Sequence, residues 1–460
     1  MSSETRCSVV GLGKLGSCLA GVLASKGFEV TGVDVDDDVV AAFHRGESRL
    51  SEPQLARLLA EYRTHLRATG SHREAVQDSE VTMVVVPTPS EPTGGFSLSY
   101  VLDAMRKIGQ GIAAKADYHL VVINSTVLPG SMTVVQQALE ESSGKMCGKD
   151  FGVCYNPLFV SLGSVIPNIL RADFILIGQS DEPAGRRLEA VYHRIMESSP
   201  PIARMNFVNA ELTKLAVNTF VTTKISFANM LAEMCEQLPG ADVDVVTRAL
   251  GLDSRIGARY LQGGASYGGP CFPRDNKAII SLAQQLRCAP LIAESTDRFN
   301  HHHAQRLWGR VREVLTPGVA VAVLGLAYKP GTDVIEESFG MFLAAQLVSA
   351  GVPTMVFDPL PGAMEQCRRQ LGGNVAYAAS VTESLAEADV VIFTIPCKEF
   401  GMLTAQDFPV KAPPIAVFDC WRLLTKNLQG APHVTFLPLG VGETVPALAP
   451  SLLSSSATAS

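Results

Sequence analysis

The sequence predicts an α/β protein made of two doubly wound domains joined by a long central helix. Near the start of the chain, the apolar stretch 6–10 leads into a glycine-rich turn, and further apolar stretches alternate with helical ones. A second unit of this kind begins at Gly318. Between them, residues 209–237 contain no Gly or Pro and show helical apolar spacing. Since alternating strands and helices form parallel sheets with helices on both faces, each unit is expected to be a layered domain.

Composition limits the classes of function. A chain of 460 residues that is 47% hydrophobic is long enough to build two or three domains with their own cores. The net charge of -7 gives no electrostatic reason to expect nucleic acid or an anionic membrane as a partner. No apolar run reaches the roughly 18 residues that a membrane span needs. The ten cysteines have no metal-ligand spacing and no secretory signal precedes them, which favours reduced thiols in a cytoplasm and no metal site.

The first predicted strand, 6–10, runs directly into a glycine turn and then into a helical segment, 17–25. The turn has the spacing GxGxxG, in which backbone amides at a helix start approach a pyrophosphate. In this strand-turn-helix setting, the motif predicts a Rossmann-like domain that binds a dinucleotide. The residues expected to contact the cofactor in this turn are Gly11, Gly13, Leu15 and Gly16.

The next predicted strand, 29–33, ends at Asp34. An acidic side chain about 20 residues beyond the glycine turn accepts a hydrogen bond from the ribose 2′-hydroxyl and would repel a 2′-phosphate. Asp34 therefore favours NAD over NADP as the cofactor. The alternative is an ordinary surface aspartate, because three further Asp residues at 36–38 make this turn rich in acids.

Two later strands, 81–86 and 120–123, run into the segments 86–89 (Val-Pro-Thr-Pro) and 124–130 (Asn-Ser-Thr-Val-Leu-Pro-Gly). Ligands of a doubly wound sheet collect at the carboxyl ends of its strands, so both segments are expected at the ligand-binding edge. Thr126, in the second segment, is equally compatible with a helix N-cap. The domain is expected to continue with a strand at 174–177 and a helix at 182–196.

The helical run 209–237 would measure on the order of 40 Å at 1.5 Å per residue. A helix of this length could connect two domains and form the spine of a homodimer. Lys214 and Asn218 are four residues apart, so both side chains lie on one helix face and can reach the same group of a substrate. The competing interpretation is a surface ion pair between Glu211 and Lys214, which are three residues apart.

The segment 263–275 (Gly-Gly-Ala-Ser-Tyr-Gly-Gly-Pro-Cys-Phe-Pro-Arg-Asp) places Cys271 after two glycine pairs, and Asp275 follows four residues later. Glycine pairs let the backbone take positive φ and approach a ligand closely. A helix start, which Pro273 favours, or a nearby cation stabilises the thiolate form of a cysteine. The segment therefore predicts a presented, reactive thiol, although an isolated cysteine is more often buried and structural.

In their order along the chain, the segments from Val9 to about Asp358 closely resemble the UDP-glucose/GDP-mannose dehydrogenase family, above all in the cysteine loop. The resemblance implies that the C6 alcohol of a nucleotide-linked hexose is oxidised to a carboxylate with two NAD. It also implies that a cysteine attacks the intermediate aldehyde and that the resulting thioester is hydrolysed. The catalytic residues that it implies are Cys271, Lys214, Asn218, Asp275 and Thr126.

The resemblance also gives these residues roles. Lys214 and Asn218 would stabilise developing negative charge on the substrate oxygen, and Asp275 and Thr126 would position water. A buried Lys and Asp pair shifts both pKa values, so the protonation role of each partner stays open. The family also implies that Pro87 and Thr88 line the cofactor, together with Thr126.

Further contacts to the substrate are implied. Lys329, in the turn after the strand 319–324, would meet a phosphate or the sugar, and Arg255 would reach the substrate from the partner subunit of a homodimer. A plain surface salt bridge is the alternative for Arg255. The family usually carries an Arg near Glu336 that this chain lacks, so the choice of nucleotide stays open. The implied substrate contacts are Phe159, Lys214, Asn218, Arg255, Tyr260, Gly268 and Lys329.

The sequence departs from the family at 155–163 (Tyr-Asn-Pro-Leu-Phe-Val-Ser-Leu-Gly). The family usually has glutamates where this chain has Leu158 and Leu162. The resemblance implies that the first of these glutamates handles water during thioester hydrolysis. A leucine cannot move a proton, and loss of a general base typically costs about 10²- to 10⁴-fold. Hydrolysis could therefore persist slowly through neighbouring acids, or it could be lost, which would leave an aldehyde product or a long-lived acyl-enzyme.

The predicted organisation follows from these segments. It comprises an NAD-binding domain over 1–205, a central helical connector with the active-site loop over 206–300, a nucleotide-sugar-binding α/β domain over 301–448, and a disordered tail over 449–460. The strands expected in the third part are 319–324, 352–357, 390–394 and 415–418.

Other functions remain compatible with the sequence. Oxidation could stop at the C6 aldehyde, or the chain could be a non-catalytic nucleotide-sugar-binding protein. A two-electron β-hydroxyacid dehydrogenase also has a Lys and an Asn on a helix beside a Rossmann domain, but it does not need the cysteine loop. The run His301-His302-His303 has no further ligand at convincing metal spacing, so it is expected to cap or line a helix.

Overall fold

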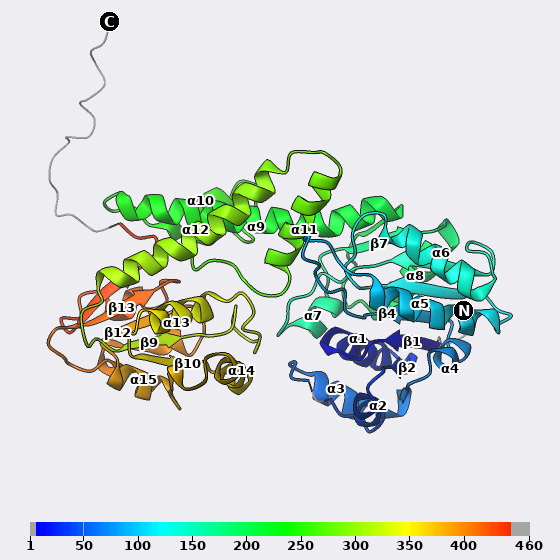
Figure 1. The fold of residues 1–460 in the computed structure, drawn as a ribbon, viewed down its shortest axis with the longest axis horizontal. Helices are drawn as coiled ribbons and strands as arrows, with labels where there is room; N and C mark the ends of the chain where they lie inside the picture. Colours follow the sequence, from blue (N-terminus) through cyan, green and yellow to red (C-terminus); the bar gives the residue numbers. More distant parts are fainter. Residues whose placement is uncertain (1–5, 49, 443–460) are drawn as a thin grey trace, which may run out of the picture. The chain divides into compact units, whose positions relative to one another are not determined.

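A computed structural model gives the fold, and it describes residues 6–48 and 50–442 (Figure 1). The predicted disordered tail, 449–460, lies outside the described residues. The bounds predicted for the three structured parts stay a prediction. The fold class is confirmed, because the described chain contains two sheets of mainly parallel strands and one helix of 31 residues between them in sequence.

The chain divides into two compact units. The first contains the residues up to Thr219 together with Arg274–Pro290, and the second contains Phe220–Pro273 and the residues from Leu291 onward. The helix α9 (Phe207–Gln237) crosses this division, and so does α11 (Phe272–Gln285). The long helix predicted at 209–237 is therefore confirmed, with two further residues at its start.

The first unit is built on an eight-stranded sheet with the order β3-β2-β1-β4-β5-β6-β7-β8. Neighbouring strands are parallel except β6 and β7, which pair antiparallel through Cys154 with Gln179 and Tyr155 with Gly178. The sheet winds outward from β1 in both directions, as in dinucleotide-binding folds. The strands are β1 (Arg6–Val10), β2 (Glu29–Val33), β3 (Leu66–Thr69), β4 (Val81–Val84), β5 (His119–Ile123), β6 (Phe151–Tyr155), β7 (Ile175–Gln179) and β8 (Ile202–Met205).

Helices cover both faces of this sheet. Leu120 and Val122 of β5 join one buried cluster, while Val121 and Ile123 join another, because alternate residues of a strand point to opposite faces. Helices α1, α7 and α8 contribute to the first cluster, and α4, α5 and α6 contribute to the second. The helices of the unit are α1 (Lys14–Ser25), α2 (Asp37–His44), α3 (Leu55–Glu61), α4 (His72–Gln77), α5 (Ser99–Ala113), α6 (Ser131–Ser143), α7 (Val165–Leu170) and α8 (Glu182–Ile195).

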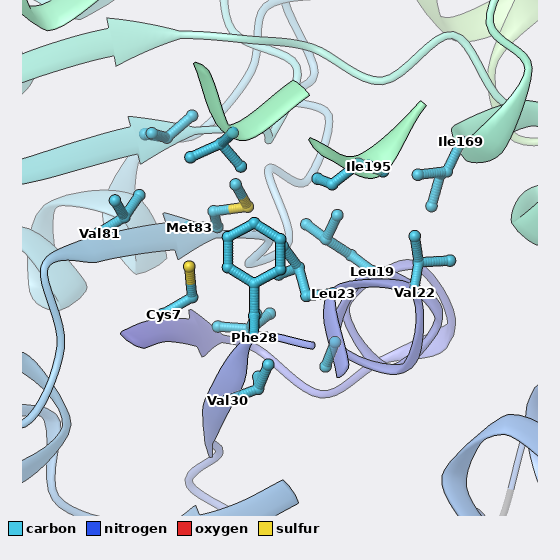
Figure 2. Close-up of a cluster of buried hydrophobic side chains, with 14 of the residues drawn as sticks. Cys7, Leu19, Val22, Leu23, Phe28, Val30, Val81, Met83, Ile169 and Ile195 are labelled. Atoms are coloured by element: carbon cyan, nitrogen blue, oxygen red, sulfur yellow. The ribbon is translucent and has the colours of Figure 1, made fainter. Parts of the chain in front are cut away.

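The packing of α1 fixes the helix that follows the glycine turn. Figure 2 shows Leu19 and Leu23 of α1 clustered with Phe28, Val30 and Met83, all of which are at most 1% exposed. Burying one such side chain contributes roughly 1.5–3 kcal/mol. The start of α1 is therefore held in a defined position relative to β1, β2 and β4.

Glu211 has a structural role that the sequence did not suggest. Its side chain is fully buried in the first unit, and its two carboxylate oxygens accept hydrogen bonds from the backbone N–H groups of Gly130 (2.8 Å) and Met132 (2.7 Å). These amides lie at the start of α6, where Gly130 offers no side-chain cap of its own. The alternative of a surface ion pair between Glu211 and Lys214 is therefore wrong.

The second unit is built on a six-stranded parallel sheet with the order β11-β10-β9-β12-β13-β14. The strands are β9 (Val321–Leu324), β10 (Thr354–Phe357), β11 (Ala376–Tyr377), β12 (Val390–Phe393), β13 (Ile415–Asp419) and β14 (Val434–Pro438). The helices are α10 (Val243–Gly251), α12 (Leu291–Glu313), α13 (Phe339–Ser349), α14 (Pro361–Leu371), α15 (Val381–Glu387) and α16 (Thr425–Leu428). The four strands predicted for this domain correspond to β9, β10, β12 and β13.

Candidate active site

The glycine turn after β1 has the shape that a pyrophosphate requires. Gly11 has φ +92°, and a Cβ atom there would lie 2.7 Å from the carbonyl oxygen of Val85. A Cβ atom on Gly16 would lie 1.8 Å from the carbonyl oxygen of Gly11, so the turn and α1 pack without room for a side chain. Gly13, the N-cap of α1, has open space at its Cβ position, and no side chain caps the helix there. The amides of this helix start are thus available to an anion.

Asp34 is fixed beside this turn at the end of β2. Its Oδ2 atom accepts a hydrogen bond from the backbone N–H of Leu12 (2.8 Å), and its Oδ1 atom accepts one from Asp36 (3.1 Å). A carboxylate has about four acceptor positions, so capacity remains for ribose hydroxyls. Leu15 packs half-buried against the core of the unit. The residues of the turn therefore fit a dinucleotide on their geometry.

The loops after β4 and β5 are tied to each other. The hydroxyl of Thr88 donates to the carbonyl oxygen of Thr126 (2.8 Å). The hydroxyl of Ser125 donates to the carbonyl oxygen of Val86 (2.6 Å). Pro87 lies between the two tied residues of the first loop. Since α6 begins at Ser131, Thr126 is not a helix N-cap, and that alternative is wrong.

Three of the predicted catalytic residues, Lys214, Asn218 and Asp275, make side-chain contacts within the first unit. The side-chain amide of Asn218 donates to Asp275 Oδ2 at 2.6 Å, and Asp275 is 1% exposed. Lys214 Nζ donates to the carbonyl oxygen of Leu158 (3.1 Å) and lies 4.5 Å from the centroid of the Phe159 ring. Lys214 and Asn218, one turn apart on α9, are thus each fixed by a contact within this unit.

One carboxylate oxygen of Asp275 is not used in a hydrogen bond within the described part of the chain. Among the described residues, its Oδ1 atom has no hydrogen-bond partner, although the guanidinium Nε of Arg274 lies 3.5 Å away. Arg274 was not predicted as a site residue. Its Nη1 donates to the carbonyl oxygen of Thr88 (3.2 Å), and its guanidinium lies 4.3 Å from the centroid of the Phe96 ring. Its neighbours Cys271 and Asp275 were the signal that could have identified it.

Cys271 stands directly before the first residue of α11, a helix of 14 residues, and it is exposed. The alternative of a buried structural cysteine is therefore wrong. The positive end of a helix dipole favours a thiolate at this position. Other cysteines are kept protonated instead, because burial raises the pKa of Cys7 and of Cys420 to about 12. Cys288 is the other exposed cysteine of the ten.

The glycine loop before Cys271 packs against the turn after β9 in the second unit. The backbone N–H of Gly269 donates to the carbonyl oxygen of Glu336 (2.9 Å), and a Cβ atom on Gly268 would lie 2.0 Å from the carbonyl oxygen of Glu337. The Lys329 ammonium lies 5.9 Å from the centroid of the Tyr328 ring, against which Gly269 packs. Gly268 and Lys329 are thus on neighbouring segments.

Two further predicted substrate contacts lie in the same unit. Tyr260 has φ +63° and meets the Phe272 ring edge-on, with centroids 6.3 Å apart, so it stands beside the residue that follows Cys271. Arg255 makes a bidentate pair with Asp253, in which Nε donates to Oδ1 (2.9 Å) and Nη2 donates to Oδ2 (2.6 Å), and its side chain is 86% exposed. Within one chain Arg255 is in a surface ion pair, as the alternative stated.

The second unit repeats the geometry of the first glycine turn. Backbone N–H groups of Leu326 (2.8 Å) and Ala327 (3.0 Å) donate to Asp358 at the end of β10, as that of Leu12 donates to Asp34. A Cβ atom on Gly340 would lie 1.9 Å from the carbonyl oxygen of Gly325. Asp358 is only 3% exposed, and burial raises its pKa. Asp358 therefore accepts hydrogen bonds from two amides of the second turn, whereas Asp34 accepts one from the first turn.

The histidine run lies inside α12. His303 is fully buried, its Nε2 atom donates to the carbonyl oxygen of Gly264 (2.8 Å), and burial lowers its pKa to about 4. Within residues 6–48 and 50–442, no three or more His, Cys, Asp or Glu side chains are arranged to hold a metal ion. In the same ranges, no helix combines the length and apolar character that crossing a membrane requires.

The fold and the site together define a class. A doubly wound sheet carries a glycine turn that fits a pyrophosphate, with an aspartate fixed at the end of the next strand. Reactive polar side chains follow on α9 and α11. This combination is that of an NAD-dependent oxidoreductase.

Comparisons with known proteins give the family. Models of the UDP-glucose/GDP-mannose dehydrogenase family match the chain in three parts: the NAD binding domain at residues 5–196, the central domain at 208–302 and the UDP binding domain at 322–426. UDP-glucose 6-dehydrogenase AglM of Haloferax volcanii is 35% identical over 425 residues, which cover 91% of this chain and 97% of that protein. GDP-mannose 6-dehydrogenase of Azotobacter vinelandii is 34% identical over 422 residues, which cover 88% and 94%.

A solved structure agrees with these matches. The UDP-glucose dehydrogenase of Pyrobaculum islandicum has a TM-score of 0.85 and 33% identity to this chain, with 96% of this chain and 98% of that chain covered. The chain therefore belongs to the UDP-glucose/GDP-mannose dehydrogenase family, and NAD is its cofactor. The resemblance stated from the sequence is confirmed.

Proposed function

We propose that the protein oxidises the C6 alcohol of a nucleotide-activated hexose, similar to UDP-glucose, to the uronate. The observation that supports this most is the exposed Cys271 at the start of α11, four residues before the buried Asp275. An exposed thiol followed four residues later in the sequence by a carboxylate suits covalent catalysis on an aldehyde. The oxidation of the alcohol to the aldehyde does not need such a nucleophile, whereas the covalent route to the acid does.

The residues would divide the chemistry between them. NAD, when bound, would accept one hydride in each of the two oxidations of C6, so two NAD are reduced per substrate. The Cys271 thiolate adds to the C6 aldehyde to give a thiohemiacetal, which is oxidised to a thioester, and water then releases the acid and restores the thiol. Lys214 and Asn218 stabilise the oxyanions, while Asp275 and Thr126 position water.

The cofactor and substrate residues follow the same proposal. Gly11, Gly13, Leu15, Gly16 and Asp34 hold the pyrophosphate and ribose, and Pro87, Thr88 and Thr126 line the cofactor. The remaining substrate contacts are Phe159, Arg255, Tyr260, Gly268 and Lys329. By their names, the relatives from Haloferax volcanii and Azotobacter vinelandii are a UDP-glucose and a GDP-mannose 6-dehydrogenase, so a hexose linked to a nucleoside diphosphate is the substrate class that we propose.

Leucines at 158 and 162 leave the hydrolytic step to another group. Two carboxylates of the first unit are committed to backbone amides: Glu211 at the start of α6, and Glu52, which accepts from Gly163 and Val165 (2.9 Å each). Asp275, whose Oδ1 atom has no hydrogen-bond partner within residues 6–48 and 50–442, is the group that we propose activates water. If it does not, the thioester would persist as an acyl-enzyme. Oxidation that stops at the aldehyde, before a thioester forms, is the second candidate function, which Leu158 favours.

We also propose a homodimer in which a second copy covers an apolar stripe. Large apolar side chains on α9 and at its end are exposed, including Phe220 (67%), Met234 (52%) and Leu238 (55%). They recur at helical spacing along one side of the helix. A single exposed apolar residue would need no explanation, but a row of them does. Arg255 would then reach the substrate of the partner subunit.

We place the enzyme in the cytoplasm, because Cys271 must stay reduced to act as a nucleophile.

Incubation with NAD and a panel of UDP-, GDP- and dTDP-hexoses tests the proposed function. We expect NADH formation with at least one nucleotide hexose, and turnover of the corresponding free hexose at least about 100-fold slower, because binding of the nucleotide positions C6. With NADP the rate should fall about tenfold or more, since Asp34 repels the 2′-phosphate. Equal rates with the free sugar, or no turnover of any member, would contradict the proposal.

A further inference from the structure

We infer that Asn229 and Asn300 are positioning residues that make the glycine-rich loop before Cys271 a rigid support. The inference rests on the proposed role of Cys271. The loop, residues 263–269, has four glycines, a composition that suggests a mobile lid. Its contacts within the second unit indicate the opposite.

Two carboxamides grip the backbone of this loop from two helices. Asn229 of α9 accepts from the N–H of Gly264 (2.8 Å) and donates to the carbonyl oxygen of Ala265 (3.3 Å). Asn300 of α12 accepts from the N–H of Tyr267 and donates to its carbonyl oxygen, both at 2.9 Å. A carboxamide is suited to this task because it carries a donor and an acceptor side by side.

Other buried groups complete the grip on the first half of the loop. Arg422 Nη2 donates to the carbonyl oxygen of Gly263 (2.7 Å), and the same guanidinium is paired with Asp244 (2.8 Å). His303 donates to the carbonyl oxygen of Gly264. The backbone from Gly263 to Tyr267 thus has four side chains as polar partners, from α9, from α12 and from the segment after β13, which leaves it little freedom to rearrange.

The glycines allow close approach and are not evidence of mobility. A Cβ atom on Gly264 would lie 2.5 Å from the ring of Trp421, and one on Gly268 would lie 2.0 Å from the carbonyl oxygen of Glu337. The loop must therefore lie against these groups with no side chain between. Glycine is the residue that loses the most conformational freedom when it is ordered, so this placement needs fixed partners.

The grip bears on catalysis through Cys271. Only two residues separate Gly268 from Cys271, so the loop and the start of α11 together set the position of the thiol. Misplacement of a reacting group by about 1 Å can cost on the order of 10²-fold in rate. Asn229 and Asn300 touch neither substrate nor cofactor in this scheme; they act by holding the loop.

The test compares Asn300→Ala and Asn300→Asp with the wild-type enzyme, using amide hydrogen exchange of the peptide 263–270 and steady-state kinetics. We expect exchange to become about tenfold faster in Asn300→Ala, and kcat to fall about tenfold while the KM for NAD stays within twofold. Asn300→Asp keeps the acceptor for Tyr267 and should lie between the two. Asn229 is 1% exposed in the wild type, and Asn229→Ala should also speed exchange and lower kcat.

Asn427→Ala is the matched control, because Asn427 also donates to a backbone carbonyl oxygen of the second unit, that of Leu403 (2.7 Å). It should leave exchange at 263–270 and kcat unchanged, even if the unfolding temperature falls as much as in Asn300→Ala. Exchange and kcat within twofold of wild type in both Asn300→Ala and Asn229→Ala would overturn the inference. Hydrogen exchange does not depend on turnover, so the two proposals can fail separately. If exchange is faster in Asn300→Ala and the Cys271→Ala enzyme still makes acid, the covalent function is rejected and the rigid loop is kept.

Discussion

Replacement of Cys271 by alanine is expected to abolish formation of the uronate, with a loss of at least about 10³-fold in acid produced per unit time. The thiol is exposed at the start of α11, where no other described cysteine stands. Without it, no thioester can form, so the second oxidation loses its covalent route. Acid formation is measured by mass spectrometry of the product after incubation with NAD and the preferred nucleotide hexose.

Cys288→Ala is the matched control for this variant, because Cys288 is the other exposed cysteine of the chain. It should retain wild-type acid formation. Binding of the nucleotide sugar should be unchanged in Cys271→Ala, since the first oxidation and the nucleotide contacts do not require the thiol. A Cys271→Ala enzyme that makes acid within tenfold of wild type would reject the covalent step.

Replacement of Lys214 by methionine is expected to lower kcat by about 10²- to 10³-fold, with little change in the KM for the nucleotide sugar. Methionine keeps most of the length and apolar character of the side chain and removes the charge. Lys214 is 7% exposed, and its ammonium is oriented by the carbonyl oxygen of Leu158 and the ring of Phe159. A cation fixed in this way stabilises a developing oxyanion without reorganisation.

Lys224→Met provides the comparison on the same helix. Lys224 also lies on α9 and also donates to backbone carbonyl oxygens, those of Ile256 and Gly257 at 3.1 Å each. Its replacement should leave kcat within about threefold, because we assign it no part in the chemistry. Equal effects of the two substitutions would show that loss of a lysine from α9 acts through stability alone.

Local patterns were enough to predict the fold class. The GxGxxG turn requires φ values and close contacts that other residues cannot supply, as Gly11 and Gly16 show, so its sequence specifies its geometry. The long helix could be predicted because 209–237 lacks Gly and Pro. Strands such as β6 and β14 were not predicted, and the antiparallel pairing of β7 was not either, since pairing direction depends on long-range packing that periodicity does not encode.

The candidate site was predicted where chemistry and spacing coincide. Lys214 and Asn218 could be placed on one face from their i, i+4 spacing, and Cys271 from its glycine frame. The contacts that hold them could not be predicted in the same way. Glu211 caps a helix that begins 80 residues earlier, and Asn229 and Asn300 grip a loop that lies between them in sequence. Such partners are brought together only by the tertiary fold.

The most direct test of the proposed reaction is the number of NADH molecules formed per nucleotide hexose consumed by the wild-type enzyme, together with the mass of the product. We expect two NADH and a carboxylate, which requires the Cys271 thioester to be hydrolysed with leucine at 158. One NADH and an aldehyde would contradict this and would show that the reaction ends after the first oxidation.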